Sequence, residues 1–152
     1  MKKKKPKKEL LISACLLGVP CRWNKKSKEN QKAIELYLKG KAVPICPEIM
    51  AGLATPRPSC EIVGGDGADV LKGKAKVVDK TGKDYSKIFI DGAKETLKLA
   101  KKLGVSRVVL KSGSPSCGVK NIYTGSFDGK KKKGMGVTAA LLKQNGIQTV
   151  EI

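Results

Sequence analysis

The chain contains no histidine, which excludes every site that uses imidazole as a base, a partner of a nucleophile or a metal ligand. Aromatic residues are scarce, with one Trp, three Tyr and two Phe, so a stacking platform for single-stranded nucleic acid has little support. No apolar run approaches the length of a membrane span. The apolar stretch that follows the first lysines stops at Gly18 without a signal-cleavage pattern. These absences favour a cytoplasmic protein.

Positive charge is in large excess, with 32 Lys and Arg against 13 Asp and Glu, a formal net charge of +19. Much of it lies in lysine runs, which are typical of solvated, flexible segments. The alternative is electrostatic steering of RNA or of a phosphorylated substrate. We expect residues 1–8 to be a basic disordered tail and residues 9–152 to be one domain, since 152 residues suit a single core. The lysine runs are Lys2–Lys5, Lys7–Lys8 and Lys130–Lys133.

Strand and helix patterns alternate along the chain, which predicts an α/β, single-domain, Rossmann-like three-layer fold with a mostly parallel central sheet. Between residues 44 and 73, Pro and Gly indicate an irregular segment, followed by a strand or hairpin arm over 74–78. Short apolar runs predict strands at Leu10–Ala14, Val43–Ile45, Arg107–Lys111 and Ile147–Ile152. Apolar stripes and caps predict helices at Lys28–Lys39 after Ser27, from Asp84 to Leu103, and at Val137–Gln144.

Five cysteines in such a chain favour a metal site or catalysis over a disulfide framework. Cys15 and Cys46 directly follow predicted strands, and Cys117 lies in the loop after a third. Ligands bind beyond the carboxyl ends of strands in open α/β sheets, so these thiols should converge there. No Cys-x-x-Cys pair is present, which argues against a zinc ribbon. A sulfur-only site suits an iron–sulfur cluster or zinc, whereas the alternative is three small buried hydrophobes.

Neighbouring residues add candidates for chemistry. Glu48, two residues after Cys46, is either a general base or a surface acid at a turn. The loop Ser112–Gly118 is rich in hydroxyls and N–H groups that can orient a polar substrate. Arg57, between two prolines, can grip a phosphate or carboxylate, or form an ion pair within the protein. Gly134–Gly136 precedes a helix and is a candidate anion seat.

Taken together, these motifs resemble the thiouracil desulfidase (TudS-like) family, formerly a domain of unknown function. The resemblance runs from about Leu10 to the C-terminus, with several motifs in the same order. They are Ile12–Gly18, Cys21–Trp23, Pro44–Glu48, Gly52–Leu53 with Pro56–Pro58, Lys111 with Ser114–Gly118, Ile122–Tyr123 with Gly125–Phe127, and Gly134–Leu142.

The resemblance implies a [4Fe-4S] cluster held by Cys15, Cys46 and Cys117. It implies desulfuration of a thiolated pyrimidine, either thiouracil or thiouridine monophosphate, without redox change of the substrate. The open iron of the cluster would take the sulfur, with Glu48 activating water and Ser114 assisting. Residues in the same motifs are candidate substrate contacts: Arg57, Ser13, Lys111 and Ser116.

The sequence departs from the family pattern at Trp23, where Tyr is commoner, at Asn24, and at Ser59–Cys60. These differences bear on substrate preference more than on the cluster. Cys21 has no role in the implied scheme and is interpreted as a packing or supporting thiol, and Cys60 as incidental. Two other functions stay open: a basic RNA-binding module with structural zinc, and a sulfur carrier that delivers sulfide to an acceptor such as tRNA.

Overall fold

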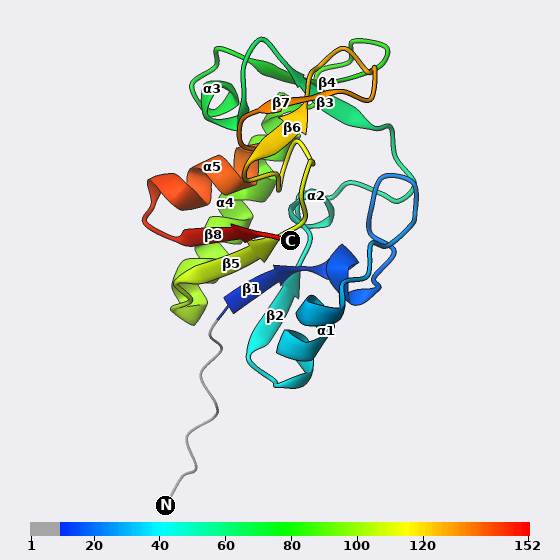
Figure 1. Ribbon diagram of the computed structural model, residues 1–152. Helices are drawn as coiled ribbons and strands as arrows, with labels where there is room; N and C mark the ends of the chain where they lie inside the picture. Colours follow the sequence, from blue (N-terminus) through cyan, green and yellow to red (C-terminus); the bar gives the residue numbers. More distant parts are fainter. Residues whose placement is uncertain (1–9) are drawn as a thin grey trace, which may run out of the picture.

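A four-stranded parallel sheet forms the centre of the computed structural model, which describes residues 10–152 (Figure 1). The predicted tail, residues 1–8, lies outside the described residues. The strands run in the order β2-β1-β5-β8, and every neighbouring pair is parallel. Pro44 is tolerated because β2 lies at the edge of the sheet. The bounds are β1 Leu10–Ser13, β2 Ala42–Ile45, β5 Arg107–Leu110 and β8 Gln148–Glu151.

Helices cover both faces of this sheet, which confirms the predicted three-layer α/β fold. Leu11, Val108 and Leu110 pack with apolar residues of α4 and α5. Their neighbours Ile12 and Val109 point the other way, toward α1 and the short 3₁₀ helix after β1. This alternation is the two-residue period of a strand buried on both sides. The covering elements are α1 Gln31–Leu38, α4 Ser86–Leu103, α5 Val137–Gln144 and the 3₁₀ helix Ala14–Leu17.

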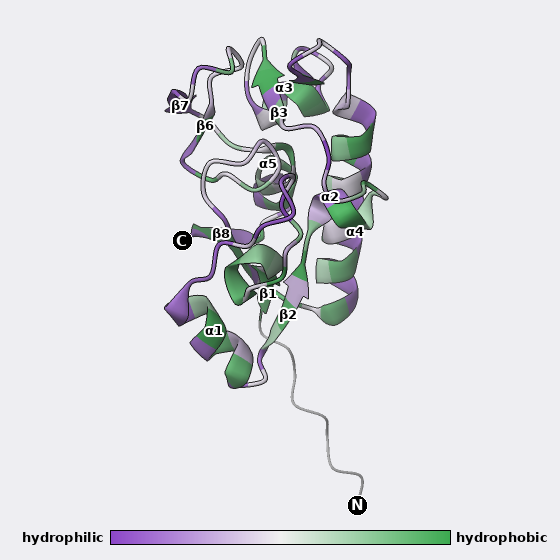
Figure 2. Ribbon diagram, turned by 90° about the vertical axis from the view of Figure 1, so that its right-hand side faces the viewer, coloured by the Kyte–Doolittle hydropathy of each residue, from purple (hydrophilic) through white to green (hydrophobic). Residues whose placement is uncertain are grey.

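Two of the three long helices begin where the sequence predicts. α5 has the predicted bounds, and α4 begins just after Asp84, whose Oδ1 accepts a hydrogen bond of 2.8 Å from the Ser86 N–H. The predicted start of α1 at residue 28 is wrong. Asn30 is the cap, because its side chain accepts a hydrogen bond from the Ala33 N–H, and Ser27 lies outside the helix. Helix α4 carries hydrophobic and hydrophilic stretches in alternation along its length (Figure 2).

A second, antiparallel layer lies beyond the carboxyl ends of the parallel strands (Figure 1). Its two hairpins pair β3 with β4 and β6 with β7. The prediction of an irregular segment between residues 44 and 73 is wrong, because α2, β3 and α3 form there, whereas the predicted hairpin arm is β4. The bounds are α2 Pro47–Met50, β3 Cys60–Val63, α3 Gly67–Leu71, β4 Lys76–Asp79, β6 Asn121–Tyr123 and β7 Lys131–Lys133.

The lysine run Lys130–Lys133 is mostly strand, which contradicts the prediction of a flexible segment. Strand β7 pairs with β6, and the Lys131 ammonium lies 5.4 Å from the centre of the Tyr123 ring. Backbone pairing and this cation–π contact offset the mutual repulsion of the lysines. Among residues 10–152, no helix has the length and apolar character needed to cross a bilayer.

Candidate functional site

A cavity of about 130 Å³ lies between the carboxyl ends of β1, β2 and β5 and the antiparallel layer. Residues from both layers line it. Ile45 at the end of β2 lies on the sheet side, and Tyr123 of β6 and Lys131 of β7 lie on the other. The position is the one expected for a ligand site in an open parallel sheet.

The three thiols predicted to converge all line this cavity. Cys15 lies in the 3₁₀ helix that directly follows β1, and Cys46 is the N-cap residue of α2 immediately after β2. Cys117 reaches the cavity from the loop that follows β5. All five cysteines carry free thiols, so no disulfide competes for these sulfur atoms. Parallel strands thus bring together donors that are 31 and 71 residues apart in the sequence.

Burial and mutual contact set the acidity of these thiols. A hydrogen bond from the Cys21 thiol lowers the pKa of Cys15, outweighing the effect of burial. For Cys46, the contact with Cys21 and then burial raise the pKa. Burial raises the pKa of Cys117 to about 12. Cys46 and Cys117 therefore hold their protons at neutral pH, and binding a metal would require their release.

No three Cys, Asp or Glu side chains within residues 10–152 are gathered closely enough to hold one metal ion. Ligands of a single zinc lie about 2.0–2.3 Å from the metal, which forces them together. Thiolates that bind different irons of one cluster sit further apart. The zinc alternative stays a prediction.

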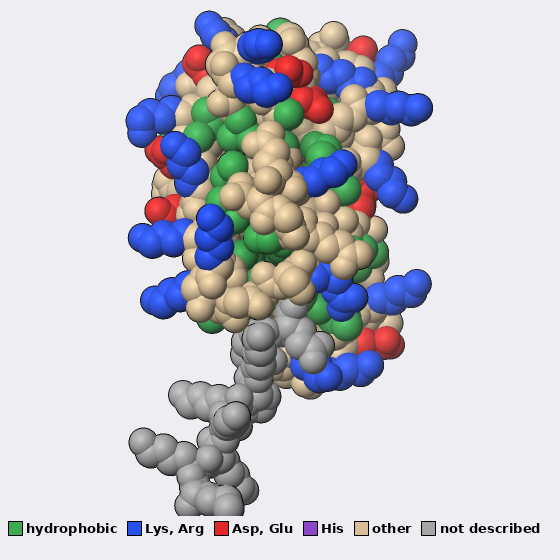
Figure 3. Space-filling view, turned by 90° about the vertical axis from the view of Figure 1, so that its left-hand side faces the viewer, with side chains coloured by type: hydrophobic (Ala, Val, Ile, Leu, Met, Phe, Trp, Pro, Cys, Tyr) green, Lys and Arg blue, Asp and Glu red, His purple; other side chains and the backbone are tan. Residues whose placement is uncertain are grey.

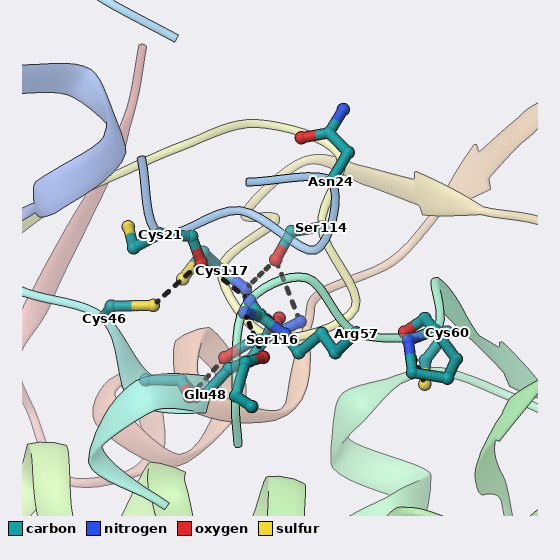
Figure 4. A network of polar contacts seen from close by, with 12 residues as sticks. Cys21, Asn24, Cys46, Glu48, Arg57, Cys60, Ser114, Ser116 and Cys117 are labelled. Atoms are coloured by element: carbon teal, nitrogen blue, oxygen red, sulfur yellow. Dashed lines mark hydrogen bonds and ion pairs between the residues drawn. The ribbon is translucent and has the colours of Figure 1, made fainter. Parts of the chain in front are cut away.

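The two other cysteines also line the cavity but occupy different parts of it. Cys21 is buried, its thiol contacts those of Cys15 and Cys46, and its carbonyl oxygen lies 3.9 Å from Cys46 Sγ. Cys60 lies apart from Cys21, Cys46 and Cys117, on the far side of Arg57 (Figure 4). The interpretation of Cys21 as a supporting thiol accords with these contacts.

The N-terminus of α5 holds the loop that carries Cys117. The Val137 N–H donates to the Pro115 carbonyl at 2.8 Å, and the Thr138 N–H donates to the Ser116 carbonyl at 2.9 Å. A side chain at Gly136 would overlap the Ser116 carbonyl, so glycine permits this close approach. The predicted anion seat before α5 is therefore wrong, because the helix N–H groups are already bound to loop carbonyls.

Ser114 stabilises the same loop through its side chain. Its hydroxyl oxygen accepts hydrogen bonds from the Ser116 N–H at 3.0 Å and the Cys117 N–H at 2.7 Å. The hydroxyl hydrogen has no acceptor among the described residues, and Ser114 lines the cavity. Ser114 can thus fix the Cys117 backbone while donating to a bound ligand.

Glu48 and Arg57 form an ion pair in the cavity wall, so the intramolecular alternative for Arg57 is the one observed. Arg57 Nε donates to Glu48 Oε2 at 2.8 Å, and Nη2 donates both to that oxygen and to the Cys21 carbonyl. The side chains are 6% and 16% exposed for Arg57 and Glu48. Glu48 Oε1 has no hydrogen-bond partner among the described residues and is left for a water or ligand.

The remaining candidate contacts divide into two groups. Ser13 and Lys111 line the cavity, where the Ser13 hydroxyl accepts a hydrogen bond from the Lys111 N–H at 3.0 Å. Burial, and then the positive charge of Arg22, lower the pKa of Lys111. Ser116 does not line the cavity. Its hydroxyl is buried 2.8 Å from Thr138 Oγ1, so the prediction that it contacts substrate conflicts with its position.

Sequence reasoning missed several residues of the cavity wall. Arg22 and Lys131 line the cavity together with Lys111, and none of the three forms an ion pair with a described residue. Glu48 is the only carboxylate among the lining residues, and Arg57 neutralises it. The wall thus carries a net positive charge. Lys131 was missed because nothing in a lysine run indicates which member faces inward.

Basic side chains elsewhere are scattered rather than gathered into a stripe on the face drawn in Figure 3. They lie mainly around the rim of that face, and its centre is apolar or uncharged. A stripe of clustered Lys and Arg is the usual footprint of a nucleic-acid interface. That face therefore gives no support to an RNA-binding module.

Comparison with known proteins gives concordant results. A family model described as 2-thiouracil desulfurase matches residues 10–151. An uncharacterised protein of Bacillus subtilis (strain 168), YbbK, is 48% identical over 141 residues, which are 93% of each chain. The solved structure of a [4Fe-4S]-dependent thiouracil desulfidase, TudS, is 39% identical, with a TM-score of 0.84. That alignment covers 95% of this chain and 91% of the other.

The hydrogen bond between the Ser116 and Thr138 hydroxyls should contribute to the stability of the protein. Ser116→Ala should leave the buried Thr138 hydroxyl unpaired and lower the free energy of unfolding by about 1–3 kcal/mol. Thr138→Val removes the other partner, and the double variant should lose less than the sum of the two. Chemical denaturation of the four proteins measures this coupling. An additive result would show that the two hydroxyls do not interact.

Proposed function

Because the chain belongs to the 2-thiouracil desulfurase family, we propose that it replaces the sulfur of a thiolated pyrimidine with oxygen. One observation carries the proposal: three cysteines that follow three parallel strands line one cavity together with Glu48 and Ser114. The net change, thiocarbonyl plus water giving carbonyl plus hydrogen sulfide, alters no oxidation state. An electron donor is therefore not required. A cytoplasmic location stays a prediction.

Cys15, Cys46 and Cys117 would hold a [4Fe-4S] cluster, the cofactor that the solved thiouracil desulfidase structure is named for. The sulfur-only donor set of the cavity and the absence of histidine fit such a cluster. With three protein ligands, such a cluster would supply one open iron, a Lewis acid suited to a soft substrate atom such as sulfur. Cys21 contacts two of these ligands and supports their position.

Glu48 is the general base in this proposal. Its Oε1 accepts a proton from a water molecule, which attacks the thiocarbonyl carbon. Arg57 holds the other carboxylate oxygen, so the carboxylate points in one direction while the water binds. This arrangement makes Arg57 a positioning residue instead of a phosphate ligand.

Ser114 and the cations of the wall act on the substrate. The Ser114 hydroxyl can donate to the pyrimidine while its oxygen stays bound to the loop N–H groups. Lys111, Arg22 and Lys131 have no acidic partner among the described residues. Unpaired cations in a cavity wall favour an anionic ligand. We therefore assign a thiouridine monophosphate as the preferred substrate over the free base.

Cluster ligation is tested by replacing each cysteine. Cys15→Ala, Cys46→Ala and Cys117→Ala should each abolish a stable cluster after anaerobic reconstitution, because each removes an iron ligand. Cys60→Ala and Cys21→Ala should retain it. Visible absorption and iron and sulfide content measure the outcome. Loss of the cluster in Cys21→Ala with retention in Cys15→Ala would replace Cys15 by Cys21 in the ligand set.

The role of Glu48 is tested by Glu48→Gln, which keeps the shape and removes the proton acceptor. The cluster should persist, and the turnover number should fall by roughly 10²–10⁴-fold, the usual worth of general acid–base catalysis. Sulfide release under anaerobic conditions measures the rate. Near-normal turnover with an intact cluster would mean that Glu48 only pairs with Arg57.

The substrate assignment is tested with a panel of 2-thio and 4-thio bases, nucleosides and monophosphates. Monophosphates should have the highest kcat/KM, and their advantage should shrink as salt rises, because the Debye length is about 10 Å at 0.1 M. Lys131→Ala should reduce the advantage, whereas Lys133→Ala on the same strand should not, since Lys133 does not line the cavity. Equal activity on nucleosides and monophosphates at low salt contradicts the assignment. No sulfide from any member contradicts the function.

A further inference from the structure

The only tryptophan of the chain lies at the cavity and is only partly covered by the protein. Trp23 is 44% exposed and lines the cavity. An aromatic side chain of this size normally gains free energy from burial, so a half-exposed indole beside a cavity marks a contact surface. Tyr37 is equally exposed, at 45%, but it does not line the cavity.

The other aromatic residues of the wall have less free surface. Tyr85 and Phe89 are 8% and 4% exposed and belong to the apolar core beneath the antiparallel layer. The ring of Tyr123 has the Lys131 ammonium over it. Trp23 is therefore the most exposed aromatic residue of the cavity wall.

The backbone holds Trp23 in place before any ligand arrives. The Lys25 N–H donates to the Arg22 carbonyl at 2.9 Å, which closes a tight turn around the tryptophan. The Arg57 N–H donates to the Trp23 carbonyl at 2.8 Å. Since the Arg57 side chain binds Glu48, one residue ties the backbone of Trp23 to the general base. A preorganised aromatic surface binds a flat ring with little loss of conformational entropy.

We propose that the indole of Trp23 stacks on the pyrimidine ring at the mouth of the cavity and makes planarity of that ring a requirement for binding. The inference rests on the proposed function and adds a specificity-determining residue to it. Stacking is insensitive to ring substituents, because it uses the face of the ring. Trp23 thus accepts 2-thio and 4-thio isomers alike and discriminates against saturated rings such as dihydro-2-thiouracil, which lack an aromatic face.

Steady-state kinetics of the reconstituted protein test the stacking. Trp23→Ala should raise KM for thiolated pyrimidines roughly 5- to 150-fold, the usual effect of losing one base–aromatic stack, with a smaller change in kcat. Trp23→Phe should restore most of the affinity, and Tyr37→Ala serves as the control. The preference for 2-thiouracil over dihydro-2-thiouracil should fall in Trp23→Ala and survive in Trp23→Phe. If Trp23→Ala does not fold, Trp23→Leu makes the same comparison.

A binding measurement without turnover gives the second readout. Uridine monophosphate, the oxygen analogue, should change the intrinsic emission of the purified full chain, because the chain has a single tryptophan. Unchanged emission at saturation, or unchanged KM and ring discrimination in Trp23→Ala, would overturn the stacking while wild-type desulfuration continued. If the wild type releases no sulfide from any thiolated pyrimidine while the emission still responds, the proposed function fails and the stacking surface stands.

Discussion

Parallel pairing of β1 with both β2 and β5 is the constraint on which the site depends. The register places Ser13 beside Ile45, so Cys15 and Cys46 leave the sheet at the same edge within two residues of the paired ends. Strand β5 pairs on the other side of β1 and delivers its following loop to that edge. An antiparallel partner would have sent one of these thiols to the opposite end. Topology, more than local sequence, therefore creates the sulfur-rich cavity.

Two further sets of hydrogen bonds hold the residues of the cavity wall in fixed positions. The N-terminus of α5 holds the loop of Cys117 through the Pro115 and Ser116 carbonyls. On the other wall, Arg57 binds Glu48, the Cys21 carbonyl and the backbone of Trp23 at once. Both sets give hydrogen-bond partners to buried N–H, carbonyl and side-chain groups that would otherwise have none. The protein itself therefore satisfies the polar groups of the cavity wall. The cations of the wall that form no ion pair with a described residue give the cavity its positive charge. They are Lys111, Arg22 and Lys131.

The sequence was sufficient for the parallel sheet, for α4 and α5, and for the meeting of three cysteines, because apolar periodicity and strand-end placement are local signals. It was insufficient where the outcome depends on distant partners. The start of α1 moved to Asn30 because that side chain, and not Ser27, reaches a free N–H. Lys131 became part of the wall through pairing with β6 and contact with Tyr123. Ser116, chosen for its motif, turned inward to Thr138, which no spacing rule reveals.

The thiols that line the cavity also belong to the apolar cores of the protein. Cys117 packs with Leu11 and Leu142 in one core, and Cys15 and Cys21 pack with Ile12 in another. Close packing in these cores fixes the backbone of each of these cysteines when the chain folds. A substitution deep in either core can therefore displace a thiol and alter the cavity without touching any residue that lines it.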